Sequence, residues 1–182
     1  MKKKNIIFIA LVLILALCSI RCYLLNKNIP EKYVIDRYEV GQVIQLDAVS
    51  IEVKSFKTVQ RSKAYDGDNQ IGCILEINVK NTSKDIVDLI PLLQESKLSS
   101  GVYYQDYCNV DTDIKNVSAF PPKAEANLTF TYVIYKDALK YVKDKKEFKF
   151  YIGKREYENQ IKDRLSKLQI YGKYVELRGD LE

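Results

Sequence analysis

The chain has 182 residues, with 29 Lys and Arg against 24 Asp and Glu, a net charge of +5, and no histidine. The lack of histidine excludes Ser-His-Asp and Cys-His nucleophilic systems and histidine-ligated zinc or copper. Four basic residues and no acidic residue lie in residues 1–25, which leaves 25 basic against 24 acidic residues in the remainder. The excess positive charge therefore belongs to the amino terminus and is not the footprint of a nucleic-acid-binding protein.

Residues 1–25 have the features of a segment that enters a membrane. Lys2, Lys3 and Lys4 precede an unbroken apolar run at residues 6–17. Continued past Arg21 to residue 25, this run supplies about the ~20 residues that a bilayer core requires. Basic residues before such a run orient its amino terminus toward the cytoplasm. We therefore expect an uncleaved signal anchor, a single transmembrane helix with the rest of the chain outside the cytoplasm.

The same features describe a secretory signal peptide, so cleavage remains an alternative. Ala16-Leu17-Cys18 is a fair match to the small-residue pattern that precedes a cleavage site. Lipidation is a third alternative, although Cys18 follows a leucine and Cys22 an arginine, where a lipidated cysteine follows a small residue. All three alternatives place the remainder outside the cytoplasm.

The next segments predict a linker followed by short strands. Residues 26–37 are polar and contain Pro30, and we interpret them as a linker to a domain that spans residues 38–182. Residues 40–46 predict a short strand. Residues 49–59 alternate apolar and polar side chains, the pattern of a half-buried strand. Residues 61–70 are a polar loop.

The middle of the chain contains the clearest strand. Alternation over residues 71–79 places Cys73 and Ile77 on one apolar face. Residues 86–98 are apolar but interrupted by Pro91, which indicates an edge strand or a bulge. Ser99-Ser100-Gly101 is typical of a hairpin turn, after which residues 102–110 return as a strand.

The last third predicts two strands and a helix. Residues 128–134 and 148–152 alternate as strands, separated by a charged excursion at residues 136–146. Tyr157, Ile161, Leu165 and Leu168 recur at helical spacing. We expect a short amphipathic helix that packs on the sheet, with contact to a membrane surface as the alternative. The final residues are interpreted as a frayed strand or tail.

About seven short strands separated by turn signals predict an all-β fold, an antiparallel β-sandwich. The order of features also resembles a known group. The carrying features are the lysine-rich anchor, the Val40-Gly41 strand, the Leu-Glu-Ile-Asn-Val-Lys-Asn-Thr-Ser segment at residues 75–83, the Gly101 hairpin and the Pro121-Pro122 loop before residues 128–132. This order resembles the immunoglobulin-like, telokin-like extracytoplasmic domains of unknown function from Gram-positive bacteria. The resemblance covers residues 39–153 and implies a module associated with the membrane or cell wall. The helical stretch after residue 155 departs from that pattern.

Two sets of residues are candidate sites. Cys73 and Cys108 are an even pair in an oxidising compartment and so a candidate disulfide, with two buried hydrophobic residues as the alternative. Tyr103, Tyr104 and Tyr107 are a candidate partner surface, because tyrosine offers contact area and a polar tip at low entropy cost. Cross-strand packing is the alternative for these tyrosines.

Metal and cofactor chemistry has little support in the sequence. Asp66-Gly67-Asp68-Asn69 fails the EF-hand register, since Ile71 takes the glycine position and Ile77 the closing glutamate position. A looser oxygen site there, or at Asp111 and Asp113, competes with a simple solvated loop. No Gly-x-Ser-x-Gly, Ser-x-x-Lys, Gly-x-Gly-x-x-Gly or P-loop motif occurs. We therefore expect no metal, no cofactor and no enzymatic activity.

The resulting hypothesis is a membrane-anchored, extracytoplasmic binding or scaffolding module of the bacterial cell envelope. Its partners would be the membrane, through one amino-terminal span, and a protein or cell-wall component, but not nucleic acid. An immunity or inhibitor protein that neutralises a secreted toxin or enzyme at the membrane is the alternative. An enzyme that uses only carboxylates, lysine or tyrosine is a third possibility.

Overall fold

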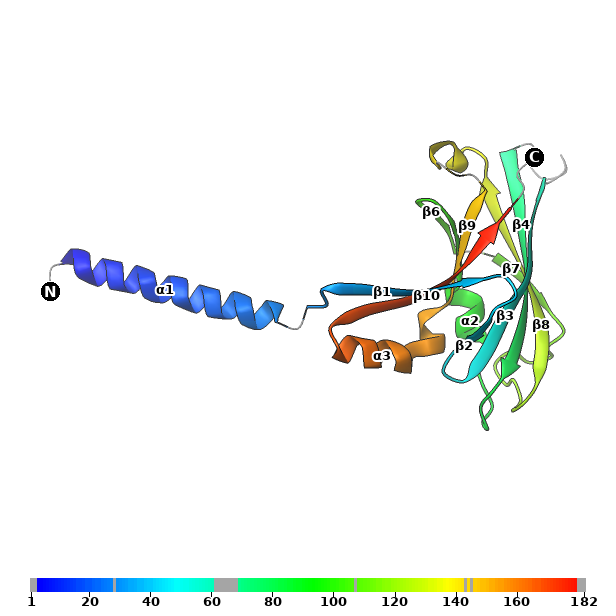
Figure 1. Cartoon of the computed structure of the whole chain (residues 1–182), viewed down its shortest axis with the longest axis horizontal. Helices are drawn as coiled ribbons and strands as arrows, with labels where there is room; N and C mark the ends of the chain where they lie inside the picture. The colour runs from blue at the N-terminus through cyan, green and yellow to red at the C-terminus, as the bar shows by residue number, and fades with distance from the viewer. Residues whose placement is uncertain are drawn as a thin grey trace.

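The alternating segments form two five-stranded sheets that lie face to face in the computed structural model (Figure 1). The structure describes residues 3–27, 29–60, 69–106, 108–142, 144 and 146–179. The first sheet has the order β1 (Lys32–Glu39), β10 (Gln169–Arg178), β9 (Glu147–Tyr151), β5 (Lys97–Ser100) and β6 (Tyr103–Gln105). The second has the order β2 (Val43–Gln45), β3 (Val49–Gln60), β4 (Gln70–Asn81), β8 (Glu125–Tyr135) and β7 (Cys108–Thr112). The helices are α1 (Lys3–Asn26), α2 (Ile90–Glu95), α3 (Glu158–Ser166) and the 3-10 turns η2 (Ala138–Tyr141) and η3 (Lys154–Tyr157).

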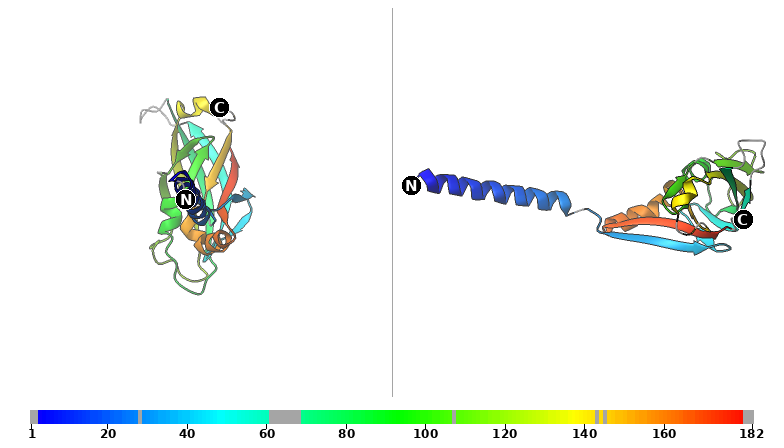
Figure 2. Two further views of the ribbon diagram at one scale, coloured as in Figure 1. Left: turned by 90° about the vertical axis from the view of Figure 1, so that its left-hand side faces the viewer. Right: turned by 90° about the horizontal axis from the view of Figure 1, so that it is seen from above.

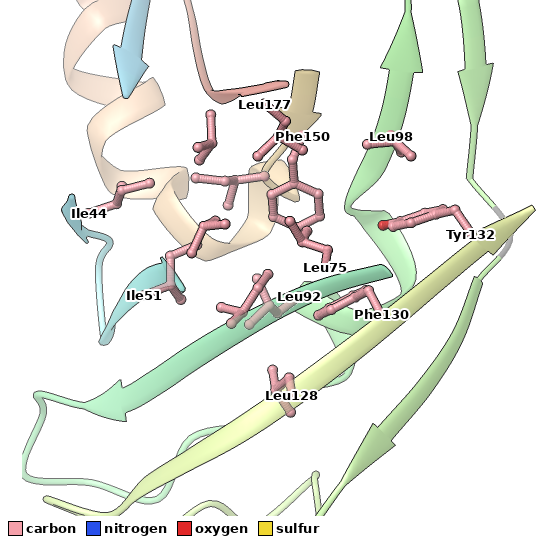
Figure 3. Close-up of a cluster of buried hydrophobic side chains, with 14 of the residues drawn as sticks. Ile44, Ile51, Leu75, Leu92, Leu98, Leu128, Phe130, Tyr132, Phe150 and Leu177 are labelled. Carbon is pink, nitrogen blue, oxygen red and sulfur yellow. The ribbon is translucent and has the colours of Figure 1, made fainter. Parts of the chain in front are cut away.

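The core between the sheets follows the predicted alternation. In β4 the side chains of Ile71, Cys73, Leu75, Ile77 and Val79 are all buried. They meet the buried face of β8, which contributes Leu128, Phe130 and Tyr132, and Phe150 of the opposite sheet (Figure 3). Phe130 and Phe150 pack edge to face with ring centroids 5.7 Å apart. The predicted β-sandwich and the phase of its central strand are therefore confirmed.

The predicted linker is wrong from Lys32 onward. Residues Lys32–Glu39 form β1, which pairs in parallel with β10 over eight residues. The sandwich is therefore not purely antiparallel, because this sheet is mixed. The period-2 signal in β1 is weak because the inward positions are Val34, Asp36 and Tyr38, of which only Val34 is aliphatic.

Of the two interpretations of the final residues, the strand is confirmed and the tail is wrong, and the strand is not frayed. Residues Gln169–Arg178 form β10, which lies inside the first sheet with β1 on one edge and β9 on the other. Its parallel partner β1 lies near the other end of the chain, in the segment interpreted as a linker, whereas β9 is close in sequence. The short helix before it is confirmed as α3, although Leu165 near its end is exposed.

The segment around Pro91 is a helix and not an edge strand or bulge. Pro91 sits in the first turn of α2, where its missing N–H costs no helical hydrogen bond. The hairpin at Gly101 is confirmed, since β5 and β6 pair across it and Gly101 has φ +57°. The return strand is divided between the sheets, with β6 in the first and β7 in the second.

The amino-terminal helix α1 extends away from both sheets (Figures 1 and 2). The structure describes its side chains from Leu11 onward, and its large apolar side chains from Leu11 to Leu25 are exposed around the helix. Among the residues that the structure describes, no helix combines the length and apolar character needed for a membrane span.

Replacement of Ile77 by aspartate is expected to abolish folding. Ile77 is 1% exposed, so the variant would place an unpaired carboxylate in the core. The expected loss exceeds about 4 kcal/mol, comparable to the whole stability of a small domain. Ile86→Asp is the matched control, because Ile86 is 65% exposed. Equal thermal melting of the two purified variants would contradict the strand phase.

Candidate functional site

The outer face of the first sheet contains a groove of about 800 Å³. Strand alternation puts Tyr33 and Ile35 of β1 on this face, opposite Ile170 and Gly172 of β10. β9, the strand on the other side of β10, ends at Tyr151, and the groove opens past the end of that strand. We call this the tyrosine groove. Its lining includes Tyr33, Ile35, Glu95, Lys97, Tyr104, Asp106, Tyr151, Tyr157, Ile170, Tyr171, Gly172 and Lys173.

Tyrosine rings form a continuous row beside the groove. Tyr104 of β6 and Tyr151 of β9 have ring centroids 5.7 Å apart, and Tyr151 and Tyr174 are 5.4 Å apart. The Lys149 ammonium lies 5.4 Å from the Tyr174 ring centroid and the Arg37 guanidinium 6.0 Å. Burial, followed by contact with the Tyr104 hydroxyl, raises the pKa of Tyr151. The Tyr151 hydroxyl therefore stays protonated at neutral pH and offers a hydrogen bond beside an apolar ring surface.

The charged groups at the rim of the groove are largely paired with one another. Lys97 and Asp106 approach to 3.6 Å, and the Glu95 carboxylate pairs with Arg155. The rim is therefore mixed in sign. The open space at the centre is shown by Gly172, where an added Cβ would meet no atom within 4 Å.

Beneath the groove, a buried lysine is enclosed by tyrosine rings. The Lys173 ammonium lies 5.6 Å from the ring centroid of Tyr38 and 5.8 Å from those of Tyr157 and Tyr171. It donates to the carbonyl of Gln45 at 2.9 Å, which ties β10 to β2 of the opposite sheet. Burial lowers the pKa of Lys173, and the ring faces and the carbonyl partly replace its lost hydration. We call this arrangement the lysine cage and regard it as the support of the groove.

The tyrosine of η3 joins the lysine cage to the end of β9. The Tyr157 hydroxyl accepts a hydrogen bond from the Lys173 N–H at 3.3 Å and donates one to the Ile152 carbonyl at 3.4 Å. The Tyr157 hydroxyl thus connects β10 to the residue that follows the end of β9. The Tyr171 hydroxyl donates to Asp36 of β1. Burial, then the Asp36 carboxylate, raises the Tyr171 pKa above its usual range.

A second buried ionisable group lies next to this region. Glu156 of η3 is almost fully buried, and burial raises the pKa of its carboxyl group to about 7. The backbone N–H of Leu92 opposes this shift, and the carboxylates of Glu95, Asp88 and Asp47 reinforce it. Glu156 packs between α2 and the segment before β3, and it does not line the groove.

The structure divides the predicted tyrosine surface. Tyr103 and Tyr104 are consecutive in β6, so their side chains point to opposite faces. Tyr104 is exposed and lines the groove, whereas Tyr103 is half-buried against the core. Tyr107 lies outside the described residues. Tyr104 alone of the described pair faces the groove.

The predicted disulfide between Cys73 and Cys108 is not formed, and both thiols are free. Both cysteines are paired in register with Tyr132, one on each side of β8. Two strand spacings of about 4.8 Å separate them, beyond the limit of about 7 Å for a disulfide. Burial raises the pKa of Cys73 to about 12, so this thiol remains protonated.

The structure gives no support to the two candidate metal sites, at residues 66–69 and at Asp111 and Asp113. Asp66, Gly67 and Asp68 lie outside the described residues, and Asp111 and Asp113 are exposed. Within residues 3–179, less the undescribed gaps, no three His, Cys, Asp or Glu side chains gather as a metal site.

Sequence reasoning missed most of the groove. Tyr33 lies in the segment interpreted as a linker. Tyr171, Lys173 and Tyr174 lie in the segment interpreted as a frayed strand or tail. The available signal was the tyrosine content of these terminal segments, which is unusual for linkers and tails.

The sequence matches no protein-family model and no curated protein. Two solved structures share the fold. An uncharacterised β-sandwich protein from Clostridium difficile 630 has a TM-score of 0.52 at 11% identity, covering 81% of this chain and 97% of that one. A protein of unknown function from Listeria monocytogenes EGD-e has a TM-score of 0.50 at 12% identity, covering 79% and 84% respectively. This chain is thus similar in fold to uncharacterised β-sandwich proteins of Gram-positive bacteria.

The protonation of Glu156 is expected to make stability depend on pH. Its folded pKa of about 7 exceeds the ordinary value of 4.5, so the folded state holds a proton that the unfolded state releases between these values. The contribution of Glu156 therefore destabilises the fold progressively as pH rises from about 4.5 to about 7. Glu156→Gln removes this effect. The free energy of unfolding of the variant, relative to that of wild type, should therefore be about 3 kcal/mol higher above pH 7 than below pH 4.5, since one pKa unit corresponds to about 1.4 kcal/mol.

Urea unfolding of both proteins across this pH range measures the difference. Glu39→Gln serves as the control, because Glu39 is exposed. A difference between Glu156→Gln and wild type that stays constant with pH would contradict the assignment.

Proposed function

We propose that this protein is a non-catalytic binding module of the cell envelope that uses the tyrosine groove to hold a partner. The observation that carries the proposal is the groove itself, an open, largely apolar depression bordered by a row of tyrosines. Tyrosine rings provide large contact area with little entropy to lose, and their hydroxyls supply directional hydrogen bonds. The paired charges at the rim suit a protein partner better than a strongly charged polymer.

The second part of the proposal is that residues 1–25 anchor the module in a membrane, with the sandwich outside the cytoplasm. It is supported by the three lysines before the apolar run and by the exposed apolar side chains of α1. Residues 6–10 complete that run in the sequence and precede the described side chains. The Ser19 hydroxyl donates to the Leu15 carbonyl, which satisfies its hydrogen bond within the helix. The resemblance to telokin-like extracytoplasmic domains belongs to this proposal.

A photo-crosslinking residue in place of Tyr104 is expected to give covalent adducts with the partner in intact cells. The same residue in place of Tyr135 is the control, because the two positions are 55% and 51% exposed and Tyr135 does not line the groove. Gly172→Leu should fill the groove and reduce the adducts at position 104 severalfold. The added side chain enters open space, so the melting temperature should not fall. Equal adducts at positions 104 and 135, or full adducts with Gly172→Leu, would contradict the proposed site.

The proposed topology predicts which side of the membrane each end occupies. A cysteine in place of Val102, a highly exposed residue of the sandwich, should react with a membrane-impermeant maleimide in intact protoplasts. A cysteine in place of Lys4 should react only after permeabilisation. Wild-type protein controls for the native thiols. Labelling of position 102 only after permeabilisation would place the sandwich inside and reject the proposed localisation.

A further inference from the structure

Four exposed apolar side chains gather at the end of the sandwich that carries α1. Ile29 and Tyr33 flank the start of β1, Leu165 lies in the last turn of α3, and Leu168 lies in the turn between α3 and β10. The four are between 37% and 71% exposed. The Glu31 N–H donates to the Leu168 carbonyl at 3.2 Å, and the Leu168 N–H donates to the Leu165 carbonyl at 2.9 Å. These bonds hold the two segments side by side, and we call the four residues the proximal corner.

The proximal corner includes Leu165 and Leu168, the second half of the stripe of apolar residues that recur at helical spacing along α3. Tyr157 is buried and Ile161 packs against the core, so the first half of the stripe is satisfied by the sandwich. Leu165 and Leu168 continue the same stripe beyond the core and remain exposed. Within the described part of the chain, these two apolar side chains extend past the core and have no apolar surface to cover them.

Leu168 also stands where the backbone disfavours it. It has φ +56°, the left-handed conformation that usually follows a helix and usually belongs to glycine. A leucine at this position has a steric cost, and 37% of this one remains exposed. Neither core packing nor turn geometry accounts for this residue, which points to a surface role.

The connection to α1 is short. Residues 27–31 separate the end of α1 from the start of β1, a span on the order of 20 Å at full extension. In Figure 1, the start of β1 and the end of α3 face α1, whereas the second sheet lies on the far side. A membrane that holds α1 therefore lies within reach of the proximal corner.

The charge around the proximal corner suits a lipid surface. Five basic residues and three acidic residues lie in residues 27–33 and 158–168. Lys162 pairs with Glu158 at 2.9 Å and Lys167 with Asp163 at 2.7 Å, and Lys27 and Lys32 add positive charge beside the tether. Apolar side chains bordered by lysines are the pattern of a segment that lies in the headgroup region.

We propose that the proximal corner rests on the membrane surface, with Leu165 and Leu168 in the boundary between headgroups and acyl chains. This inference depends on the proposed anchoring of α1. The contact limits the rotation of the sandwich about its tether. Because Tyr33 belongs to both the proximal corner and the tyrosine groove, the contact places one end of the groove beside the bilayer.

The chain contains no tryptophan, so a single introduced tryptophan reports on this contact without background. Leu165→Trp and, as a milder aromatic exchange, Tyr33→Trp are placed in the full chain and reconstituted into vesicles of neutral and anionic phospholipid. Lipids brominated close to the headgroup quench tryptophan that enters the boundary. Ile86→Trp, in the loop after β4 of the other sheet, is the control.

The expected result is quenching at positions 165 and 33 that exceeds quenching at position 86 severalfold, with blue-shifted emission and a weaker effect in purely neutral vesicles. Quenching at positions 165 and 33 as weak as at position 86, in protein that floats with the vesicles, would overturn the surface contact and leave the anchor intact. Failure of the full chain to float with vesicles would overturn the anchoring itself.

Discussion

The position of β10 between β1 and β9 is the constraint on which the first sheet depends. Within the described part of the chain, β1 pairs only with β10, and β9 ends after five residues. Alternation along β10 sends Tyr171, Lys173 and Val175 inward and Ile170, Gly172 and Tyr174 outward. One strand thus supplies both the lysine cage on its inner face and the tyrosine groove on its outer face. A register slip of a single residue would exchange the two sets.

The lysine cage and the tyrosine groove use the same residue type for different purposes. In the lysine cage, tyrosine rings surround a cation that has lost most of its water, and the Gln45 carbonyl accepts a hydrogen bond from it. In the tyrosine groove, rings from β1, β6 and β9 are left open to a partner. The difference lies in what covers each face, since α3 and η3 shield the inner side of β10, and nothing in the described chain covers the outer side (Figures 1 and 2).

The short tether after α1 relates these features to the proposed anchor. Because β1 begins a few residues after α1, the first sheet is the layer that meets whatever surface holds the helix. Groove, lysine cage and proximal corner all involve β1 or β10. The second sheet, with the longer strands β3, β4 and β8, supplies most of the aliphatic core. It stands farther from α1 than the first sheet (Figure 1).

Local pattern was sufficient for the second sheet and for the hairpin. The alternation in β4 and β8 is strong because each of these strands buries one whole face of apolar residues, and the first half of β3 does the same up to Val53. Gly101 supplies the positive φ that its turn requires. The sequence alone therefore determined a β-sandwich, the phase of Ile77, the short helix after Tyr157 and an apolar amino terminus.

Tertiary structure decided the rest. β1 and β10 carry Asp36, Lys173 and Glu176 among their tyrosines, so neither shows a clean alternation of apolar and polar residues. Each forms a strand because it pairs with the other, from opposite ends of the chain. The separation of Cys73 from Cys108 by β8 and the assembly of the tyrosine groove both follow from strand order. Strand order is a property of long-range pairing, which no local window of residues contains.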